Sequence, residues 1–528
     1  GHILVEGFGL IYQMYMEEYY TPEEAVQSIL INNLFGLDID DRAAQLATFA
    51  ILLKAAKVYP EVWKKNWLPN VYAMPEAQEF SLQEVKDFLG AEGTDYVEEL
   101  EASLRLMKQA KNLGSVMKLI ISKEARAFIE KRFVEVENSD YRDFNLEAVF
   151  QNLKRYIPVL LILTKKYSSV VANPPYMGQG TMNAALKNYV NVHYPISKSD
   201  LFAVFMESTL AMNIENGLMG MINQHSWMFL SSYEKLRNHI VDNYGIVNML
   251  HLGSRTFEEL SGEVVQSTAF VLENGKNIEK ATYYRLVDYK NINEKEDHFL
   301  TKENQHINIS QNNFNKIPGK PIAYWVSKKV LEIFSSDSSL GSLSKPKMGM
   351  RTGDNNRFLR LWHEISHIKF ALNNLDKKWV PYRKGGTFRK WFGNLEYVVN
   401  WENDGYEIKE NTLINYPQLS WDNLGWKITN EKDFFKSGIE YSRISGGSIG
   451  ARFYDEGTIF DSACCSFFNP DYDKYVAAFL NSSVSISFLK VISPTLTFQA
   501  GDVAKLPFRN ENLDDVVLVV NDLINSAK

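Results

Sequence analysis

The stretch Tyr167–Tyr176, which reads YSSVVANPPY, decides how this chain of 528 residues is interpreted. Its first six residues are aromatic, small or β-branched and predict a strand over 167–172. The turn Asn173-Pro174-Pro175-Tyr176 follows directly, and two prolines cannot continue a strand's hydrogen-bond ladder. In open α/β sheets, ligands bind beyond the carboxyl ends of the strands. The stretch therefore predicts a ligand-binding turn at the edge of such a sheet.

The chemistry of this turn suits methyl transfer to the nitrogen of a planar amine. Such an amine is a poor nucleophile because its lone pair is delocalised. The Asn173 side chain and the Pro174 carbonyl can accept both amino hydrogens and so aim the lone pair at a sulfonium methyl group. Pro174 and Pro175 hold that carbonyl in place, and Tyr176 offers a ring on which a base can stack. Catalysis would rest on alignment, with no metal ion. The alternative is a purely structural, proline-stiffened turn.

The sequence around this turn alternates between helical and strand patterns. A short apolar strand at 34–39 ends in acidic residues, Asp40 or Asp41 can cap the following helix, and another strand falls at 70–74. Further expected elements are helices over 6–30, 200–215 and 233–244 and strands over 218–223, 246–252 and 265–272. Residues 81–165 read as a helical insertion. The pattern predicts an α/β fold with a doubly wound, Rossmann-like sheet.

With these motifs the chain resembles the gamma-class amino methyltransferases, and specifically the adenine-specific DNA methyltransferases of bacterial BREX phage-defence systems. The segment 36–40, GLDID, matches the segment whose first acid holds the ribose hydroxyls of the cofactor. Residues 1–4 resemble the end of the family's glycine-rich cofactor loop, and the segments 199–202 and 220–227 resemble two further structural motifs. Members of the family are longer at both ends. We therefore expect an internal part of a longer protein, inactive or weakly active because its cofactor loop is truncated.

The resemblance implies a site-specific DNA adenine-N6 methyltransferase that uses S-adenosyl-L-methionine and flips its target base out of double-stranded DNA. It also implies other phage-defence subunits as partners. The implied cofactor-binding residues are Gly1, Asp38, Ile39 and Glu76. Phe257 falls where the family places an aromatic residue beside the flipped base, next to Tyr176. It remains open whether Asp38 only supports a helix cap and whether Phe257 belongs to the core.

The residue composition of the chain changes after Asn274. We expect a catalytic domain over 1–275, a connecting segment over 276–340 and a mixed α+β target-recognition domain over 341–528. The net charge of −7 argues weakly against a nucleic-acid partner, but residues 341–400 hold 12 Lys or Arg against 4 Asp or Glu. This local excess suggests a surface for a polyanion; the alternative is a solvated face. The candidate DNA-binding residues are Arg351, Asn355, Arg357, Arg383, Lys384, Arg389, Arg443 and Gln499.

The composition excludes several classes of protein. Cys464 and Cys465 are the only cysteines and are adjacent, so a disulfide framework is excluded. No apolar run approaches the roughly 20 residues that cross a bilayer, and we expect a cytoplasmic protein without a membrane partner.

Three functions compete with this interpretation. His363-Glu364-Ile365-Ser366-His367 matches the zinc-protease pattern, although chance supplies that string in about one of fifty chains of this size. A protein-glutamine methyltransferase is also compatible with the sequence, because the Asn-Pro-Pro-Tyr turn suits a side-chain amide as well. The third is a non-catalytic DNA-binding subunit, which the truncated cofactor loop would suit.

Overall fold

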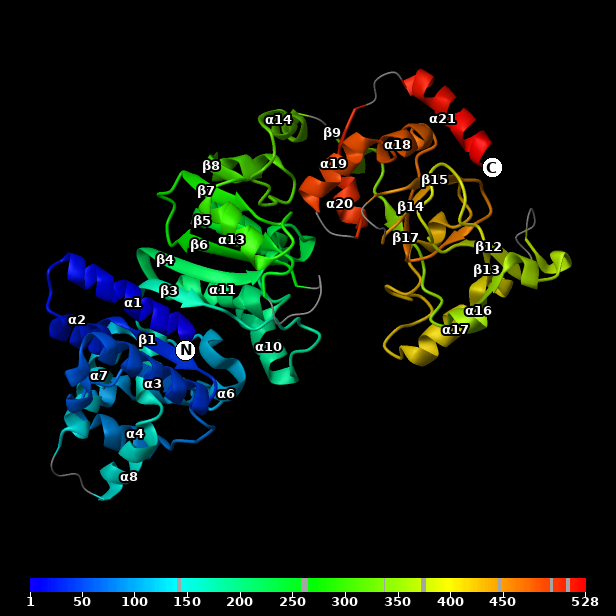
Figure 1. Ribbon diagram of the computed structural model, residues 1–528. Coiled ribbons are helices and arrows are strands. Elements are labelled where there is room, and N and C mark those ends of the chain that lie inside the picture. The colour runs from blue at the N-terminus through cyan, green and yellow to red at the C-terminus, as the bar shows by residue number, and fades with distance from the viewer. Residues whose placement is uncertain are drawn as a thin grey trace. The chain divides into compact units, whose positions relative to one another are not determined.

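A computed structural model describes residues 1–139, 144–257, 265–336, 338–371, 377–444, 448–493, 497–509 and 513–528. The chain forms two compact α/β units, shown in Figure 1. The first comprises Gly1–His225 and Asp242–Ile307, and the second comprises Ser226–Val241 and Asn308–Lys528. The first unit thus continues past residue 275, the boundary expected from the sequence, because two further strands join its sheet.

The described part of the first unit holds a six-stranded sheet of order β3-β4-β6-β5-β7-β8. Its strands are β3 (Tyr167–Ala172), β4 (Asn213–Gln224), β5 (Gly245–Gly253), β6 (Ser267–Glu273), β7 (Lys280–Arg285) and β8 (Gln305–Ser310). β3 is parallel to β4, β5 is parallel to β7, and β6 is antiparallel to both β4 and β5. The carboxyl ends of β3, β4, β5 and β7 therefore lie along one edge, which we call the carboxyl edge. Helices α10 (Ala184–His193), α11 (Leu201–Ala211) and α13 (Ile292–Leu300) accompany this sheet.

A parallel pair, β1 (Phe35–Asp38) and β2 (Asn70–Ala73), lies beside the start of β3. The ring of Phe35 contacts that of Tyr167 at a centroid distance of 5.5 Å, so β1 and β3 begin next to each other. The pair packs with α1 (His2–Glu17), α2 (Pro22–Ser28) and α3 (Asp41–Val58).

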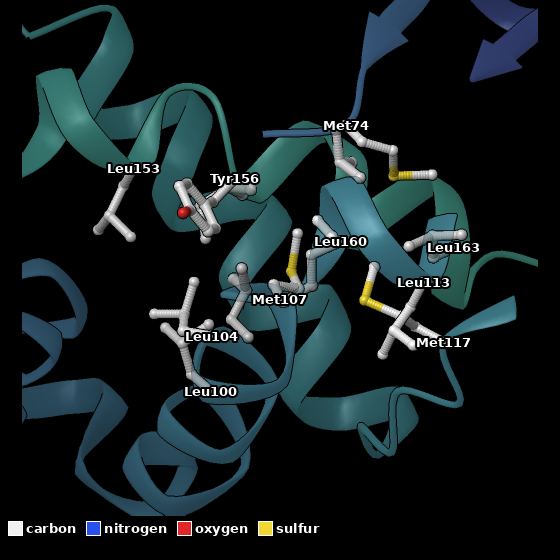
Figure 2. Packing of buried hydrophobic residues seen from close by; sticks show 14 of the residues in the cluster. Met74, Leu100, Leu104, Met107, Leu113, Met117, Leu153, Tyr156, Leu160 and Leu163 are labelled. Carbon is white, nitrogen blue, oxygen red and sulfur yellow. The ribbon is translucent and has the colours of Figure 1, made fainter. Parts of the chain in front are cut away.

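The helical insertion connects β2 to β3. Its helices are α4 (Leu82–Leu89), α5 (Val97–Met107), α6 (Ala110–Leu113), α7 (Lys123–Glu137), α8 (Phe144–Leu153) and α9 (Ile157–Thr164). Figure 2 shows apolar side chains of α5, α6, α8 and α9 packed together with Met74, which follows β2, and buried residues of α4 and α7 belong to the same cluster. Met182 and Leu186, which flank the start of α10, belong to the same cluster. The insertion therefore shares one hydrophobic core with the elements that surround the Asn-Pro-Pro-Tyr turn.

The second unit mixes helices with several small sheets. Its described sheets have the orders β10-β17-β14-β15, β11-β13-β12-β16 and β18-β9. The strands are β9 (Ser338–Ser339), β10 (Lys347–Met348), β11 (Leu359–Leu361), β12 (Trp379–Arg383), β13 (Tyr397–Asn400), β14 (Gly438–Ser442), β15 (Ala451–Tyr454), β16 (Ile459–Phe460), β17 (Cys464–Phe467) and β18 (Pro507–Phe508). The helices are α12 (Glu234–Asn243), α14 (Lys328–Ser336), α15 (Leu340–Leu343), α16 (Asn355–Phe358), α17 (Glu402–Asn415), α18 (Asp473–Leu480), α19 (Ser483–Ile492), α20 (Ala500–Ala504) and α21 (Leu513–Ala527).

The expected mixture of helices and strands is confirmed, with two differences in the first unit. The helix expected over 6–30 is two helices, because α1 ends at Glu17, Tyr19 takes a positive φ of 65°, and Thr21 caps α2. The helix expected over 200–215 ends at Ala211, and β4 already begins at Asn213. Gly217 lies inside β4, and a Cβ there would be only 3.0 Å from a carbonyl oxygen. This glycine permits a close backbone approach within the strand and does not mark the end of a helix.

Within the described residues, no single helix is long and apolar enough to cross a membrane. The bent pair α18 and α19 passes that test by length and composition only.

Candidate functional site

Asn173 begins the turn that follows β3 at the carboxyl edge. Pro174 is buried, whereas Asn173 and Pro175 are exposed. Among the residues that the structure describes, the Asn173 side chain forms no hydrogen bond. A buried proline thus anchors the turn and leaves an amide oxygen at the edge free to accept a hydrogen bond from a ligand.

Asp200 holds the segment after this turn. Its carboxylate accepts hydrogen bonds from the amides of Met177 (2.9 Å) and Phe202 (3.2 Å), and so caps α11. The amide of Leu201 in turn donates to the Met177 carbonyl at 3.0 Å. Burial raises the pKa of Asp200, although these backbone hydrogen bonds oppose the shift. The sequence pointed to 199–202 as a motif but did not identify Asp200 as the residue that fixes the turn.

The Tyr176 ring stands edge-on to Phe202 at a centroid distance of 6.1 Å. Its hydroxyl is buried and has no hydrogen-bond partner within the described part of the chain, and the same is true of the Ser267 hydroxyl at the start of β6. Burial raises the pKa of Tyr176. The nearby Ser267 hydroxyl opposes the shift, although the two oxygens do not have hydrogen-bond geometry. Within the described residues, the Tyr176 ring therefore packs against Phe202 while its hydroxyl makes no hydrogen bond.

A buried histidine pair lies at the same edge. Nδ1 of His225, directly after β4, is 2.8 Å from Nε2 of His251 in β5. Burial lowers the pKa of His225 to about 4 and that of His251 well below its usual value. Both rings are therefore neutral near pH 7, and one nitrogen donates while the other accepts.

Asp38 ends β1, and its carboxylate accepts the Asp40 amide at 3.0 Å. It makes no second side-chain hydrogen bond within the described ranges. The cap of α3 is Asp40, which accepts the amides of Arg42 and Ala43. Ile39, 51% exposed, lies between the two acids. An acceptor with spare capacity beside an exposed apolar side chain fits a nucleoside, which offers two hydroxyls and a flat ring.

Glu76, another of the expected cofactor-binding residues, follows β2 and is exposed. Its carboxylate lies 3.3 Å from the ammonium of Lys111 in α6, which also contacts Asp41 at 2.9 Å. Lys111 was not identified from the sequence, because it is 70 residues from Asp41 and no local motif marks it.

The two remaining candidates of the first unit are Gly1 and Phe257. Gly1 is exposed at the start of α1, where its carbonyl accepts the amides of Leu4 and Val5. Phe257 is half-buried in the turn after β5, where the Thr256 hydroxyl binds the Gly253 carbonyl. Its partial exposure is compatible with either a core or a base-contacting role.

Arg383 requires a correction, because it is not available to DNA. It is fully buried, and its guanidinium donates to Glu440 (2.9 Å) and to the Thr458 hydroxyl (2.8 Å). Arg452 binds the other oxygen of Glu440 at 3.1 Å. Arg383 ends β12 with its side chain inside the unit, a placement that the basic composition of the segment did not reveal.

Arg443 and Gln499, which are 56 residues apart, meet in the structure. The Arg443 guanidinium donates to Gln499 Oε1 at 3.1 Å and to the Ser462 carbonyl at 3.0 Å. A bridge between Ile444 and Thr497 joins the two segments next to this pair. Residues 445–447 and 494–496, which lie close to this pair in the sequence, are outside the described residues.

The remaining DNA-binding candidates lie at the surface. Arg351, Arg357, Arg389 and Asn355 are exposed, and Lys384 is half-buried. The Arg351 guanidinium lies over the ring of Trp426 (5.1 Å), and the Lys384 ammonium lies over that of Tyr397 (5.0 Å). Arg357 is 3.8 Å from Glu407, and Asn355 Oδ1 accepts the Thr352 hydroxyl at 2.6 Å.

The zinc-protease pattern does not form the single helix that its chemistry needs. Trp362–Glu364 and His367–Lys369 are two separate 3-10 turns with extended backbone between them. No cluster of three metal-ligating side chains occurs among the described residues. The two histidines therefore lack the helical i, i+4 spacing of a protease site.

Comparison with known proteins shows that the chain is similar to adenine-specific methyltransferases and contains a region that matches a methylase family. Residues 32–257 match the family described as Eco57I restriction-modification methylase. The whole chain is 40% identical to the adenine-specific methyltransferase PglX of Lacticaseibacillus casei (strain Zhang) and covers 45% of it. Over 98% of its length it is 37% identical to the adenine-specific methyltransferase BrxX of Escherichia coli O9:H4 (strain HS), of which it covers 44%. The chain thus spans less than half the length of these relatives. The predicted resemblance is confirmed.

The fold is similar to that of two solved restriction-modification enzymes. One is a nuclease-deletion mutant of the Type ISP enzyme LlaGI in complex with a DNA substrate mimic, with a TM-score of 0.53, 11% identity, and coverage of 99% of this chain and 43% of that one. The other is the Type IIL enzyme MmeI in complex with DNA, with a TM-score of 0.50 and 10% identity. The match covers 98% of this chain and 68% of the MmeI chain. At such low identity the likeness concerns the fold alone.

Proposed function

We propose that this chain, related in sequence to the adenine-specific methyltransferases PglX and BrxX, is the catalytic and target-recognition part of a DNA adenine-N6 methyltransferase of bacterial phage defence. The observation that carries the proposal is the position of Asn173, exposed at the end of β3 and with a side-chain amide that has no partner among the described residues. An acceptor held this way can orient an amino group.

The residues at the ends of β1 and β2 fit S-adenosyl-L-methionine, which would supply the transferable methyl group. Asp38 would accept the ribose hydroxyls, Ile39 would pack against the adenine, and Glu76 would accept from its amino group. We also infer that β1 and β2 continue the direction of the main sheet in a doubly wound arrangement, because β1 starts beside β3.

The target adenine would bind at the turn itself. Asn173 and the Pro174 carbonyl accept the two hydrogens of its amino group, and Tyr176 stacks on its ring. Phe257 is the candidate for a second aromatic contact. Flipping the base costs a few kcal/mol of stacking and pairing, which contacts with the DNA backbone must offset.

The second unit is the candidate DNA-recognition domain. Arg351, Arg357, Lys384 and Arg389 would contact phosphates or bases, and Asn355 would read a base edge. LlaGI and MmeI were solved with bound DNA, and their folds match nearly the whole chain. Other defence subunits are the expected partners.

The deciding experiment measures methyl transfer from labelled S-adenosylmethionine to duplex DNA, using a full-length protein that contains this chain. Digestion of the product to nucleosides should yield N6-methyladenine. Incorporation into protein glutamine would favour a glutamine methyltransferase instead, and duplex binding without any transfer would favour a non-catalytic DNA-binding subunit.

A further inference from the structure

Lys111 of the helical insertion contacts the segments that follow β1 and β2, both of which are distant from it in the sequence. Its ammonium donates to the Ile39 carbonyl (2.8 Å) and to Asp41 (2.9 Å), and it lies 3.3 Å from Glu76. The Lys111 ammonium thus makes two hydrogen bonds and one further ion pair, all with the segments that follow β1 and β2.

The contact with Ile39 distinguishes Lys111 from an ordinary surface ion pair. Exposed ion pairs contribute little because water screens them and side-chain entropy opposes them. A bond to the main chain instead fixes the backbone between Asp38 and the cap residue Asp40. The Asp38 carbonyl already accepts the amide of Met74 (2.8 Å), so the ends of β1 and β2 are joined to each other as well as to Lys111.

Lys111 is charged in this setting. Burial on its own would lower the pKa of its ammonium, but the interactions with the carboxylates of Asp41 and Glu76 raise it above the usual value. Only 27% of its side chain is exposed.

The neighbouring residue links α6 to the Asn-Pro-Pro-Tyr turn. Asn112 Oδ1 accepts a hydrogen bond from the side chain of Asn183 at 2.5 Å, and Asn183 caps α10 just after the turn. One short helix therefore contacts both the segment that holds Asp38 and the loop that follows Tyr176.

We propose that Lys111 is a positioning residue for the cofactor, which keeps Asp38, Ile39 and Glu76 in the geometry that a bound nucleoside requires. This inference rests on the proposed use of S-adenosylmethionine. It gives the helical insertion a role in cofactor affinity beyond filling space.

The test compares Lys111→Met and Lys111→Arg in the full-length protein, with Lys108→Met as the matched control. Lys108 follows the end of α5 and forms an ion pair with Glu79. We expect Lys111→Met to weaken binding of S-adenosylmethionine and S-adenosylhomocysteine roughly five- to tenfold by calorimetry, as loss of a charge-assisted hydrogen bond would. The KM for S-adenosylmethionine should rise by a similar factor, with kcat and duplex affinity unchanged. Lys111→Arg should restore most of the affinity, and Lys108→Met should have no effect.

Three results would count against the inference. Equal cofactor affinity in Lys111→Met and Lys108→Met would overturn it while leaving the proposed function intact. A parallel loss of cofactor affinity, duplex affinity and thermal midpoint in Lys111→Met would show a general structural role instead. Absence of S-adenosylmethionine binding by the unmodified full-length protein would overturn the proposed function and this inference together.

Discussion

At the carboxyl edge of the first unit, the side chain of Asn173 keeps acceptor capacity unused by the described protein, as does that of Asp38 at the end of β1, whereas the polar groups at the centre of the second unit bind one another. There, Glu440 lies between Arg383 and Arg452, and all three are buried. The edge thus leaves polar groups available to a ligand, and the centre uses them to hold strands together. Residue type alone does not separate the two roles; burial and hydrogen-bond partners do.

The contrast also occurs within one basic segment of the second unit. Arg383 ends β12 and is fully buried, whereas Arg389, six residues later, is exposed. Both add one positive charge to the excess over 341–400, but only Arg389 can meet a phosphate. A local charge balance therefore overestimates the cationic surface when part of the charge is internal.

The largest effect is expected on the stability of the second unit, at the buried Glu440 network. Glu440→Ala leaves two buried guanidinium groups without their shared carboxylate and should reduce the free energy of unfolding by about 3–5 kcal/mol. Chemical denaturation followed by fluorescence measures this. The exposed Glu456→Ala is the control and should change stability by less than about 0.5 kcal/mol. Similar midpoints for the two variants would contradict a structural role of the buried network.

The second-largest effect is expected on catalysis at the carboxyl edge. Asn173→Ala should lower the rate of DNA methylation by about a hundredfold or more, because an orienting hydrogen bond contributes roughly 3 kcal/mol to the barrier. Duplex affinity and thermal stability should remain unchanged. Single-turnover methylation by the full-length protein is the measurement, with the exposed Asn188→Ala as control. Full activity in Asn173→Ala would rule out the proposed chemistry.

A third pair of variants separates binding from capping at the end of β1. Asp38→Ala should weaken S-adenosylmethionine binding about tenfold, because the lost carboxylate would accept the ribose hydroxyls. The loss of stability should be small, because this carboxylate accepts only one hydrogen bond from the described part of the protein. Asp40→Ala removes the cap of α3 and should cost about 1 kcal/mol of stability with little change in cofactor affinity. Calorimetry and denaturation of both variants decide the matter. If Asp38→Ala binds the cofactor normally, Asp38 only supports the helix cap.

The smallest effect is expected at the surface of the basic segment. Arg389→Ala and Lys384→Ala should each weaken binding to all duplexes alike and reduce the slope of log K against log salt by about one. Fluorescence anisotropy over a salt series measures this, with the exposed Lys328→Ala as control. An unchanged slope in both variants would remove this segment from the proposed DNA contact.

The sequence by itself determined the strand at 167–172, the turn that ends it and the acidic end of β1. These features are local, because prolines, β-branched residues and capping acids act on their immediate neighbours. The resemblance to adenine-specific methyltransferases could be read from the sequence because it rests on short local motifs, and the comparisons confirm this resemblance. The positions of Asn173 and Asp38 at strand ends were therefore predictable.

The tertiary structure decided which side chains meet and which are buried. Lys111 reaches Asp41 over 70 residues, Arg443 meets Gln499 over 56, and Arg383 meets Glu440 over 57. No local pattern encodes such pairs, because chain topology and core packing bring these residues together. The same packing decides whether a charge faces water or a partner, and so whether it serves a ligand or stabilises the fold.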